Sequence, residues 1–437
     1  MKPQSPRRFE QSNALEQRAR AVIPGVTQTI SKRPESFALG SFPTYIDHGQ
    51  GSHVWDIDGN EYVDFVMACG PATLGYCHPE VDQAIMAQLQ RGIIFSRLTA
   101  LEVEVAELLT ALVPCAEMVR FFKGGAEANS AALRIARGAT GREMVVSCGY
   151  RGWHDQFAIN QNPRGVPGAL ASVMKQFQYN DLASLEEVLN AHPNQVAAVI
   201  IDPLSGQPPA EGFLAGVKEL AHRHGALLIF DEIVTGFRVA TGGAQEYFGV
   251  TPDMAVFAKG IANGMPLAAV TGRRDVMRVA ADLLITLTYG DESLSLAAAK
   301  AALTIYQQHD ICGHIWRIGQ AITDGVREVI AETGAPFGMG GLAPMPAFFC
   351  TGEFSGRTLS ANEQQRVWFY IMAQMAQRGV IWRRHSLLLP SYAHTDDDVD
   401  LAVAACGEVF SELVERLAAG TLEEVAPFAE APGFRRL

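Results

Sequence analysis

One lysine stands directly after an apolar run, where the neighbouring sequence supplies no partner for its charge. The run "MAVFA" (254–258) predicts a buried strand, Lys259 follows it, and the Gly- and Ala-rich turn after the lysine carries no carboxylate. Taking an ammonium group out of water is costly unless the group is paired, and burial favours its neutral form. Lys259 is therefore the first candidate for a catalytic residue.

Two acids, Asp231 and Glu232, end a second apolar run, "ALLIFDE" (226–232). Three interpretations are open: the acids face solvent or cap the next element, they hold magnesium as Walker B acids of an ATPase, or Asp231 pairs with Lys259. The ATPase requires a phosphate loop ending in Gly-Lys-Ser or Gly-Lys-Thr, and the chain contains neither tripeptide. Parallel strands bring their carboxyl ends to one crevice, which favours the pairing of Asp231 with Lys259.

A lysine and a buried aspartate in one crevice are the groups that pyridoxal phosphate (PLP) requires. The lysine forms a Schiff base with the cofactor aldehyde, for which an apolar site favours the neutral amine. The aspartate keeps the pyridine nitrogen protonated, so that the ring withdraws electrons from a carbanion. We therefore expect PLP as the cofactor, with Lys259 and Asp231 as catalytic residues and no metal.

The phosphate of such a cofactor needs a cradle, and "FFKGGAEANSAALRIARG" (121–138) has the sequence of one. A strand is followed by Gly124, Gly125 and Ala126, and then by a helix whose first N–H groups point at an anion. An aromatic side chain is also needed to stack on the ring. Tyr150, just after the predicted strand 143–148, is the candidate, although a packing role is the plainer interpretation.

These residues must be positioned by a sheet whose strands alternate with helices. Six apolar runs predict its strands: 118–122, 143–148, 196–202, 226–231, 254–258 and 267–272. Near-continuous apolar strands separated by amphipathic helices indicate an α/β fold with a mostly parallel sheet covered on both faces.

The ends of the chain have a different pattern. Residues 52–66 alternate apolar and polar around an Asp-Gly-Asn turn, which predicts a hairpin. We expect an N-terminal segment (1–74) that joins a smaller α+β domain, a large cofactor-binding domain (75–325) and a C-terminal part of the small domain (326–437). A helix is expected over residues 10–23, either on a partner subunit or on the surface of its own domain.

Composition excludes several classes of protein. The 437 residues are 48% hydrophobic and carry a formal net charge of −12, with no basic stripe to neutralise phosphates, which argues against nucleic-acid binding. The start of the chain lacks the apolar segment of a secretory signal, and no apolar run approaches the length of a membrane span. Seven scattered cysteines without a CxxC pair predict reduced thiols in a cytoplasmic protein, neither a zinc site nor a disulfide framework.

The block from Asp231 to Met277 resembles the cofactor segment of class III aminotransferases, and most closely their glutamate-1-semialdehyde aminomutase branch. The likeness extends over roughly residues 20–415, through the motifs "WDIDGNEYVDFV", "LGYCHPEV", "VRFFKGGAEANSAALRIARGATGR", "GYRGWHD" and "AHTDDDVD". This resemblance implies the type I, aspartate-aminotransferase-like fold of PLP-dependent transferases. It also implies a homodimer with active sites at the subunit interface.

The resemblance also assigns roles residue by residue. Lys259 matches the Schiff-base lysine and Asp231 the partner of the pyridine nitrogen. Ile233 matches the branched residue on one ring face and Tyr150 the aromatic residue on the other. Thr288 matches the threonine that reaches the phosphate from the neighbouring subunit, and Gly124, Gly125 and Ala126 occupy the phosphate loop.

The sequence departs from the family pattern around the substrate. The phosphate loop lacks the usual hydroxyls, Asp202 replaces a usual glutamate, and "GDES" follows Thr288 in place of Ser-Gly-Asn-Pro. The positions of the aminomutase's substrate-binding arginine and pocket tryptophan hold Ser31 and Cys69, with Lys32 and Arg33 adjacent. The cofactor residues are kept while the substrate pocket differs, which argues against the aminomutase reaction.

These inferences favour an aminotransferase that moves an amino group between a small-molecule donor and a keto or aldehyde acceptor. The alternatives are an aminomutase, racemase or epimerase on the same scaffold, and a catalytically silent relative that binds the cofactor. An anionic substrate group would be held by an arginine. The candidates are Arg383 and Arg384, which we favour, then Arg33 and Arg151. Without such a clamp, a neutral amine or amino sugar becomes the expected substrate.

Overall fold

The computed structural model describes residues 6–204, 206–384 and 386–425, so the outermost parts of the two predicted end segments lie outside the described residues. The chain forms two compact units. The terminal unit consists of Met1–Cys69, Gly75–Cys77 and His314–Leu437, and the central unit of Gly70–Leu74 and His78–Gly313. The sequence placed the second boundary near residue 325, whereas the central unit ends inside a continuous helix, α11 (Ile311–Thr333). Its apolar pattern runs through the boundary, so the sequence does not mark it.

The central unit is built on a seven-stranded sheet with the order β4-β10-β9-β8-β7-β5-β6. Neighbouring strands are parallel from β9 to β6, and β10 is antiparallel to both of its neighbours. The strands are β4 (Met118–Phe122), β5 (Met144–Cys148), β6 (Met174–Gln176), β7 (Val196–Ile201), β8 (Leu227–Asp231), β9 (Met254–Phe257) and β10 (Ala268–Gly272). All six predicted strands are present, and the mostly parallel α/β sheet is confirmed.

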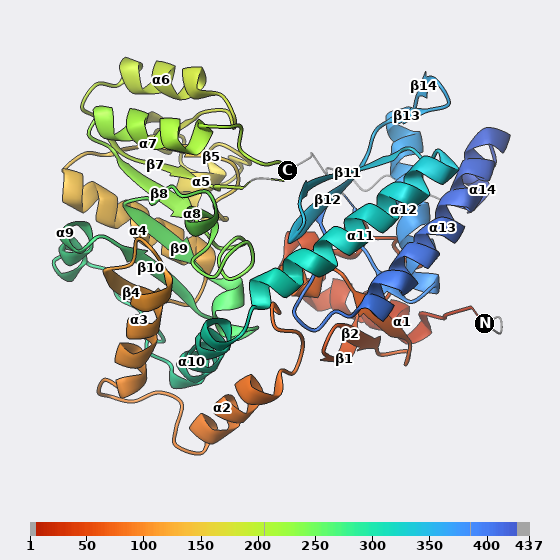
Figure 1. Ribbon diagram of the computed structural model, residues 1–437, viewed down its shortest axis with the longest axis horizontal. Helices are drawn as coiled ribbons and strands as arrows, with labels where there is room; N and C mark the ends of the chain where they lie inside the picture. The colour runs from red at the N-terminus through yellow and green to blue at the C-terminus, as the bar shows by residue number, and fades with distance from the viewer. Residues whose placement is uncertain (1–5, 205, 385, 426–437) are drawn as a thin grey trace. The chain divides into compact units, whose positions relative to one another are not determined.

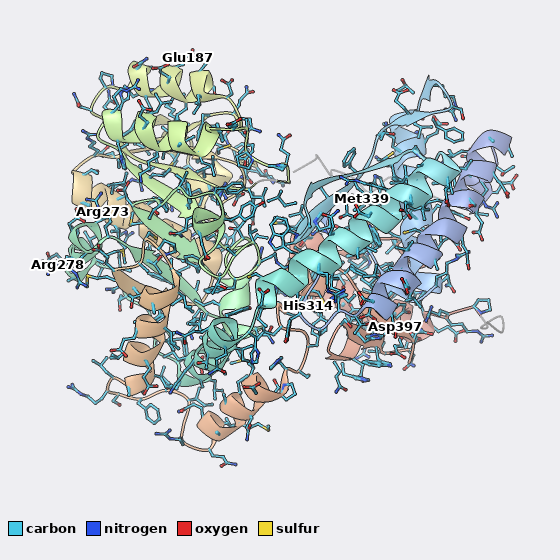
Figure 2. All side chains as sticks on the ribbon, viewed as in Figure 1. Glu187, Arg273, Arg278, His314, Met339 and Asp397 are labelled. Carbon is cyan, nitrogen blue, oxygen red and sulfur yellow. The ribbon has the colours of Figure 1, made fainter. Side chains whose placement is uncertain are left out.

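Every residue of β5, β7, β9 and β10 is buried, as expected for a sheet that helices cover on both faces. The helices of the central unit are α2 (Pro79–Leu89), α3 (Ala100–Leu112), α4 (Gly125–Thr140), α5 (Asp155–Ala158), α6 (Leu182–Ala191), α7 (Phe213–Arg223), α8 (Ala244–Tyr247), α9 (Arg274–Met277) and α10 (Ser293–Gln308) (Figure 1). Arg273 and Arg278 flank the short helix α9 (Figure 2). Short 3-10 turns lie at η4 (Gly168–Ser172), η5 (Lys259–Ala262) and η6 (Arg278–Ala281).

Helix α4 shows how the sequence fixes the packing. Its apolar positions recur at helical spacing, and Ala128, Ala132, Leu133, Ile135 and Ala136 are fully buried against the sheet. Small alanines let the helix approach the strands closely. The helix ends at Gly141, whose φ of 68° is left-handed and suits a residue without Cβ.

The terminal unit contains a four-stranded sheet with the order β1-β2-β3-β15 and a three-stranded sheet with the order β11-β12-β16. Their strands are β1 (Ile46–Gln50), β2 (His53–Asp56), β3 (Glu61–Asp64), β15 (Val380–Ile381), β11 (Phe337–Leu342), β12 (Met345–Cys350) and β16 (Ser386–Leu387). The other elements are α1 (Glu10–Val22), η1 (Ile30–Lys32), η2 (Pro34–Ser36), η3 (Met67–Cys69), the pair β13 (Glu353–Phe354) and β14 (Arg357–Thr358), α12 (Ala361–Gln377), α13 (Asp396–Ala419) and α14 (Leu422–Val425).

The predicted hairpin is β2–β3, and its turn is held by Asp56, whose carboxylate accepts hydrogen bonds from the backbone N–H groups of Asp58 and Asn60. The predicted N-terminal helix is α1. Its first turn donates two backbone hydrogen bonds to Asp58 of the same hairpin, at 2.7 and 3.0 Å. In this chain, α1 therefore packs on its own unit. Within the described part of the chain, no helix combines the length and apolar character needed to cross a membrane.

Candidate active site

Five strands that run in the same direction end at one edge of the central sheet, and each is followed by a residue singled out above. β4 leads to Gly124, β5 to Tyr150 and Arg151, β7 to Asp202, β8 ends on Asp231, and β9 leads through Ala258 to Lys259. Because the carboxyl ends of parallel strands share one edge, the fold brings these residues together. The sequence predicted this convergence for Lys259, Asp231, Gly124 and Tyr150. It offered Arg151 only as a candidate to bind a substrate anion and assigned no role to Asp202.

Asp231 is buried, with 4% of its surface exposed, and its carboxylate is held by three donors. Oδ2 accepts hydrogen bonds from Asn129 Nδ2 at 2.8 Å and from Arg151 Nη1 at 3.0 Å, and Oδ1 accepts one from the backbone N–H of Ile233 at 3.1 Å. These three donors hold the carboxylate in one orientation. Asn129, one turn into α4, was missed by the sequence analysis because nothing in its spacing points to β8.

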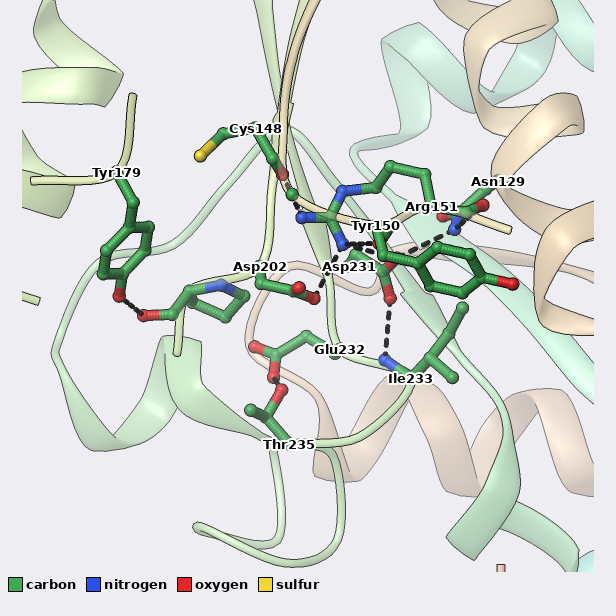
Figure 3. A network of polar contacts seen from close by, with 12 residues as sticks. Asn129, Cys148, Tyr150, Arg151, Tyr179, Asp202, Asp231, Glu232, Ile233 and Thr235 are labelled. Atoms are coloured by element: carbon green, nitrogen blue, oxygen red, sulfur yellow. Dashed lines mark hydrogen bonds and ion pairs between the residues drawn. The ribbon is translucent and has the colours of Figure 1, made fainter. Parts of the chain in front are cut away.

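Arg151 is also buried, with 2% of its surface exposed, and it joins Asp231 to Asp202 (Figure 3). Its Nη1 lies 2.7 Å from Asp202 Oδ1 and 3.0 Å from Asp231 Oδ2. The guanidinium also donates to the backbone carbonyls of Tyr150, at 2.6 Å, and of Cys148. This side chain is therefore committed to the protein interior. That argues against Arg151 as a clamp for a substrate anion, because its polar face is turned to two carboxylates.

Burial and charge oppose each other in this network. Burial by itself would lower the pKa of Arg151, but the carboxylates of Asp202 and Asp231 raise it above its ordinary value. Burial raises the pKa of Asp202 to about 6, Arg151 opposes that rise, and the neighbouring charge of Asp231 adds to it. The two carboxylates share one cation, so Arg151 stays charged.

Lys259 has an unusual backbone. Its φ is 50°, in the left-handed region that side chains with a Cβ adopt only at a cost of about 1–2 kcal/mol. It follows β9, where Val256 pairs with Asp231 of β8, and its charge lowers the pKa of Asp202. A strained backbone at a strand end beside buried carboxylates is typical of a functional residue.

The loop after β4 is shaped for close approach. Gly124 is the N-cap of α4, no side chain caps the helix, and a Cβ built at Gly124 would meet no atom within 4 Å. Gly125 is different, because a Cβ there would lie 2.5 Å from Cδ1 of Ile233. Gly152, with φ of 104°, packs on Ala126, where an added Cβ would come within 2.4 Å. The helix start is therefore fixed from two sides and left open at its tip.

The two predicted ring contacts flank this region. Tyr150 is 58% exposed and lies near enough to Asp231 that burial and this charge raise its pKa (Figure 3). Ile233 is half-buried against Gly125. Thr288, predicted to serve the neighbouring subunit, lies exposed in a turn of this chain. Glu292 of the unusual "GDES" run caps α10 and pairs with Lys123 at 3.1 Å, which gives that departure a structural role.

Glu232 has no exposed surface, and its carboxylate holds the loop that follows Asp231. It accepts backbone hydrogen bonds from Ala244 and Gln245, both at 2.8 Å, and a third from the hydroxyl of Thr235. Burial raises the pKa of this carboxyl to about 7, and these donors oppose the rise. Of the two adjacent acids, Asp231 faces the site and Glu232 faces the interior, so the second acid has a structural role.

The remaining candidates belong to the terminal unit. Arg383 and Arg384 follow β15 and are half-buried, and burial together with the charge of Arg383 lowers the pKa of Arg384. Arg33 packs against Gly25, where an added Cβ would lie 3.1 Å from its Nε. Ser31 Oγ and Cys69 Sγ are 3.7 Å apart, so the two positions aligned with substrate residues are in contact.

Cys69 also lines a cavity of about 360 Å³ within the terminal unit. Most of its wall is apolar, including Phe37, Phe42, Val54 and Ile381, and its polar groups include those of Asp64 and Tyr76. These two are satisfied by each other, because the Tyr76 hydroxyl donates to Asp64 Oδ2 at 2.6 Å. The cavity is therefore mainly apolar. Met67, Ala68 and Cys69, at its edge, have consecutive φ values of 43°, 53° and 71°.

The sequence and fold can be compared with those of known proteins. The family model of class-III aminotransferases matches residues 37–403. The chain belongs to the class-III aminotransferase family. The chain is 34% identical over 418 residues to the 3-aminobutyryl-CoA aminotransferase of Cloacimonas acidaminovorans, covering 94% of this chain and 99% of that protein. It is also 34% identical over 432 residues to the glutamate-1-semialdehyde 2,1-aminomutase of Syntrophobacter fumaroxidans, covering 93% of this chain and 98% of that protein.

Among solved structures, this member of the family is similar to the FumI protein of Sphingopyxis sp. MTA144 in its PLP internal aldimine form. The TM-score is 0.87, with 26% identity and with 94% of this chain and 98% of that chain covered. The resemblance noted in the sequence and the expected fold are thereby confirmed.

Proposed function

We propose that this class-III aminotransferase uses PLP, with Lys259 as the residue that carries the cofactor and Asp231 as the partner of its ring nitrogen. The observation that carries the proposal is the buried Asp231 carboxylate, held by three donors at the sheet edge to which Lys259 is also delivered. PLP-bound structures of relatives support the choice of cofactor: the FumI protein, and a transaminase with PLP bound that is 27% identical and has a TM-score of 0.85.

The residues present fit this cofactor. Its phosphate suits the N-terminus of α4, where Gly124 leaves the first N–H groups uncapped by any side chain and open. The loop lacks hydroxyls at Gly124 and Ala126, so backbone N–H groups and the helix dipole carry the binding. Tyr150 and Ile233 are the proposed ring contacts, and Asp231 provides the counter-charge for a protonated ring nitrogen.

When bound, PLP supplies an aldehyde that takes up amino groups and a ring that withdraws electrons from the substrate carbon. Lys259 Nζ would move the proton between the substrate carbon and C4′ of the cofactor, acting first as a base and then as an acid. Asp231 is held in one orientation because Asn129, Arg151 and the N–H of Ile233 all donate to its carboxylate. Gly125, which packs against Ile233, and Gly152, which packs against Ala126, fix the start of α4.

The residues at the positions of the aminomutase's substrate contacts support an aminotransferase more than an aminomutase. Ser31 and Cys69 stand where an arginine and a tryptophan are implied for the aminomutase, and they contact each other beside an apolar cavity. The hydroxyl of Ser31 and the thiol of Cys69 supply no charge for a carboxylate, although Lys32 lines the same cavity. If the substrate has an anionic group, Arg383, Arg384 and Arg33 remain the candidates to bind it, and Cys69 lines space for an apolar part.

We propose a homodimer formed through the central unit. Large apolar side chains are exposed from α2 to α3 and again before α10: Met86, Leu89, Ile93, Ile94, Phe95, Leu98, Val103, Leu284 and Tyr289. So many exposed apolar side chains in these two segments suit a second copy of the chain. Thr288 lies between two of them in sequence, which supports its role in the neighbouring subunit. The seven free thiols support a cytoplasmic location.

The function is tested with a panel of amino donors and acceptors, followed by the absorbance change between the pyridoxal and pyridoxamine forms. Release of a keto acid from the donor supports transamination. Product formed without keto acid, with the amino group moved within one molecule, supports the aminomutase, and inversion of the donor supports a racemase or epimerase. A cofactor spectrum that no amine changes supports a catalytically silent protein.

A further inference from the structure

Asp231, Arg151 and Asp202 form a chain of three alternating charges. Asp231 pairs with Arg151 at 3.0 Å, and Arg151 pairs with Asp202 at 2.7 Å (Figure 3). They come from three different segments, the end of β8 and the loops after β5 and β7, and both Arg151 and Asp231 are more than nine-tenths buried. None of the roles proposed so far involves Asp202.

Arg151 is fixed mainly by its own loop. Its guanidinium donates to the carbonyls of Cys148 and Tyr150, so its position does not depend on Asp231 alone. A guanidinium fixed 3.0 Å from Asp231 neutralises part of the negative charge of this carboxylate. By itself, the pair of Arg151 and Asp231 is neutral, and a neutral pair is a weak counter-ion for a protonated ring nitrogen.

Asp202 changes this balance. It lies closer to the same Nη1 atom than Asp231 does, at 2.7 Å against 3.0 Å, and it adds a second negative charge. The three groups together then carry one net negative charge, which a protonated ring nitrogen neutralises. Both carboxylates lie within ion-pair distance of the same Nη1 atom, so Asp231 shares the charge of the guanidinium with Asp202.

We propose that Asp202 is a positioning residue which, through Arg151, keeps Asp231 oriented and only partly neutralised for the cofactor's ring nitrogen. This inference rests on the proposed function and adds two residues to it. It also explains why Arg151 is buried: the guanidinium sets the charge of Asp231 and does not bind substrate.

The test is the replacement Asp202→Asn, which keeps the shape of the side chain and removes its charge. We expect PLP to bind the apoenzyme more weakly by on the order of 10- to 100-fold, the effect typical of residues that support a metal ligand from behind. The absorbance of bound PLP should shift, and kcat should fall while KM for the donor changes little. Asp202→Glu, which restores the charge, should recover most of the affinity.

A matched control is Asp253→Asn. Asp253 is 2% exposed and pairs with Arg273 at 2.6 Å, but it precedes β9 at the opposite edge of the same sheet. Its replacement should lower the stability of the apoenzyme without changing the absorbance of bound PLP. The thermal stability of each apoenzyme separates a lost site from a lost fold. If Asp202→Asn does not fold, Arg151→Lys serves instead, because an ammonium keeps the charge but loses the fork.

A double-mutant cycle decides whether Asp202 acts through Asp231. If it does, Asp202→Asn should add little to the loss in Asp231→Asn, whereas independent effects would add. Additive losses, or an Asp202→Asn enzyme with normal PLP affinity and absorbance, would overturn the proposal while leaving Asp231 as ring partner. Normal PLP affinity and turnover in Asp231→Asn would instead remove the assignment of Asp231, and this inference with it.

Discussion

Asn129 Nδ2 donates a 2.8 Å hydrogen bond to Asp231 Oδ2, and so the helix that begins at the phosphate loop is tied to the strand that ends at the proposed ring partner. Asn129 is fully buried and also donates to the backbone carbonyl of Arg151 at 3.2 Å. One side chain thus connects α4, β8 and the loop after β5. A shift of any of these three segments would move the Asp231 carboxylate.

Asn129→Ala should lower turnover. A hydrogen bond to a charged group contributes about 1.5–3 kcal/mol, so its loss from Asp231 should reduce kcat roughly tenfold or more. Steady-state kinetics and PLP titration of the apoenzyme measure the change. The control is Thr140→Ala in the last turn of the same helix, where the hydroxyl donates to the carbonyl of Ala136 and accepts from the backbone N–H of Arg142. Equal losses in both variants would mean that the helix, and not the contact with Asp231, matters.

Lys259→Ala should abolish transamination and leave a folded protein, because the strand end tolerates an apolar residue and the phosphate loop is untouched. Borohydride reduction of the wild-type holoenzyme followed by peptide mapping should find the cofactor on Lys259. Label on another lysine would contradict the assignment.

The backbone at this position allows a second measurement. Since Lys259 has φ of 50°, Lys259→Gly relieves strain of about 1–2 kcal/mol that Lys259→Ala retains, while glycine costs about 0.4–1 kcal/mol through the unfolded chain. The Gly apoenzyme should therefore be at least as stable to urea as the Ala apoenzyme. A clearly less stable Gly variant would show that the left-handed conformation carries no strain.

The sequence indicated the residues at the strand ends, but not the side chains that contact those residues from other segments. Lys259, Asp231 and Gly124 were singled out because each lies at the end of an apolar run or just after it, and parallel strands bring such ends together. Asn129 and Asp202 were not singled out, because their partners are distant in the sequence. Asn129 contacts Asp231, 102 residues away at the end of β8, and Asp202 contacts Arg151 in the loop after β5. Arg151 was taken for a surface or substrate-binding residue, since a single sequence does not show that it is buried between two carboxylates. The second unit boundary was misplaced because α11 continues through it.

The two ends of the chain are joined by a titratable pair. His53 of β2 lies 3.0 Å from Asp398 of α13, and Ser52 donates to the same carboxylate at 2.8 Å. Burial by itself would raise the pKa of Asp398, but the hydrogen bonds from His53, Thr395 and Ser52 lower it to about 2. The bond to Asp398 raises the pKa of His53, against burial.

This pair predicts a pH dependence of stability. The contribution of Asp398, about 2 kcal/mol, is present above about pH 4 and is lost as the pH falls through about 2. The contribution of His53 is present below its ordinary pKa of about 6.5 and is lost as the pH rises through its higher folded value.

His53→Gln should thus lower the thermal stability of the apoenzyme more at pH 6 than at pH 9. His48→Gln, on an exposed pair with Asp47, is the control and should show no such difference. An equal loss for His53→Gln at both pH values would contradict the ion pair.

Leu98→Asp should convert the proposed dimer to a monomer. Leu98 is 82% exposed in this chain and lies between α2 and α3, among the apolar residues assigned to the interface. Burying a leucine contributes about 1.5–3 kcal/mol, and a two-fold interface loses this twice while it also gains two unpaired carboxylates. Light scattering coupled to size-exclusion chromatography measures the mass. Val22→Asp, at a residue that is 77% exposed on α1, is the matched control and should leave the mass unchanged.

Because Thr288 is proposed to reach the phosphate of the neighbouring subunit, the Leu98→Asp monomer should also bind PLP more weakly. A monomer that keeps full PLP affinity would remove Thr288 from the site, and a dimer that persists would place the interface elsewhere.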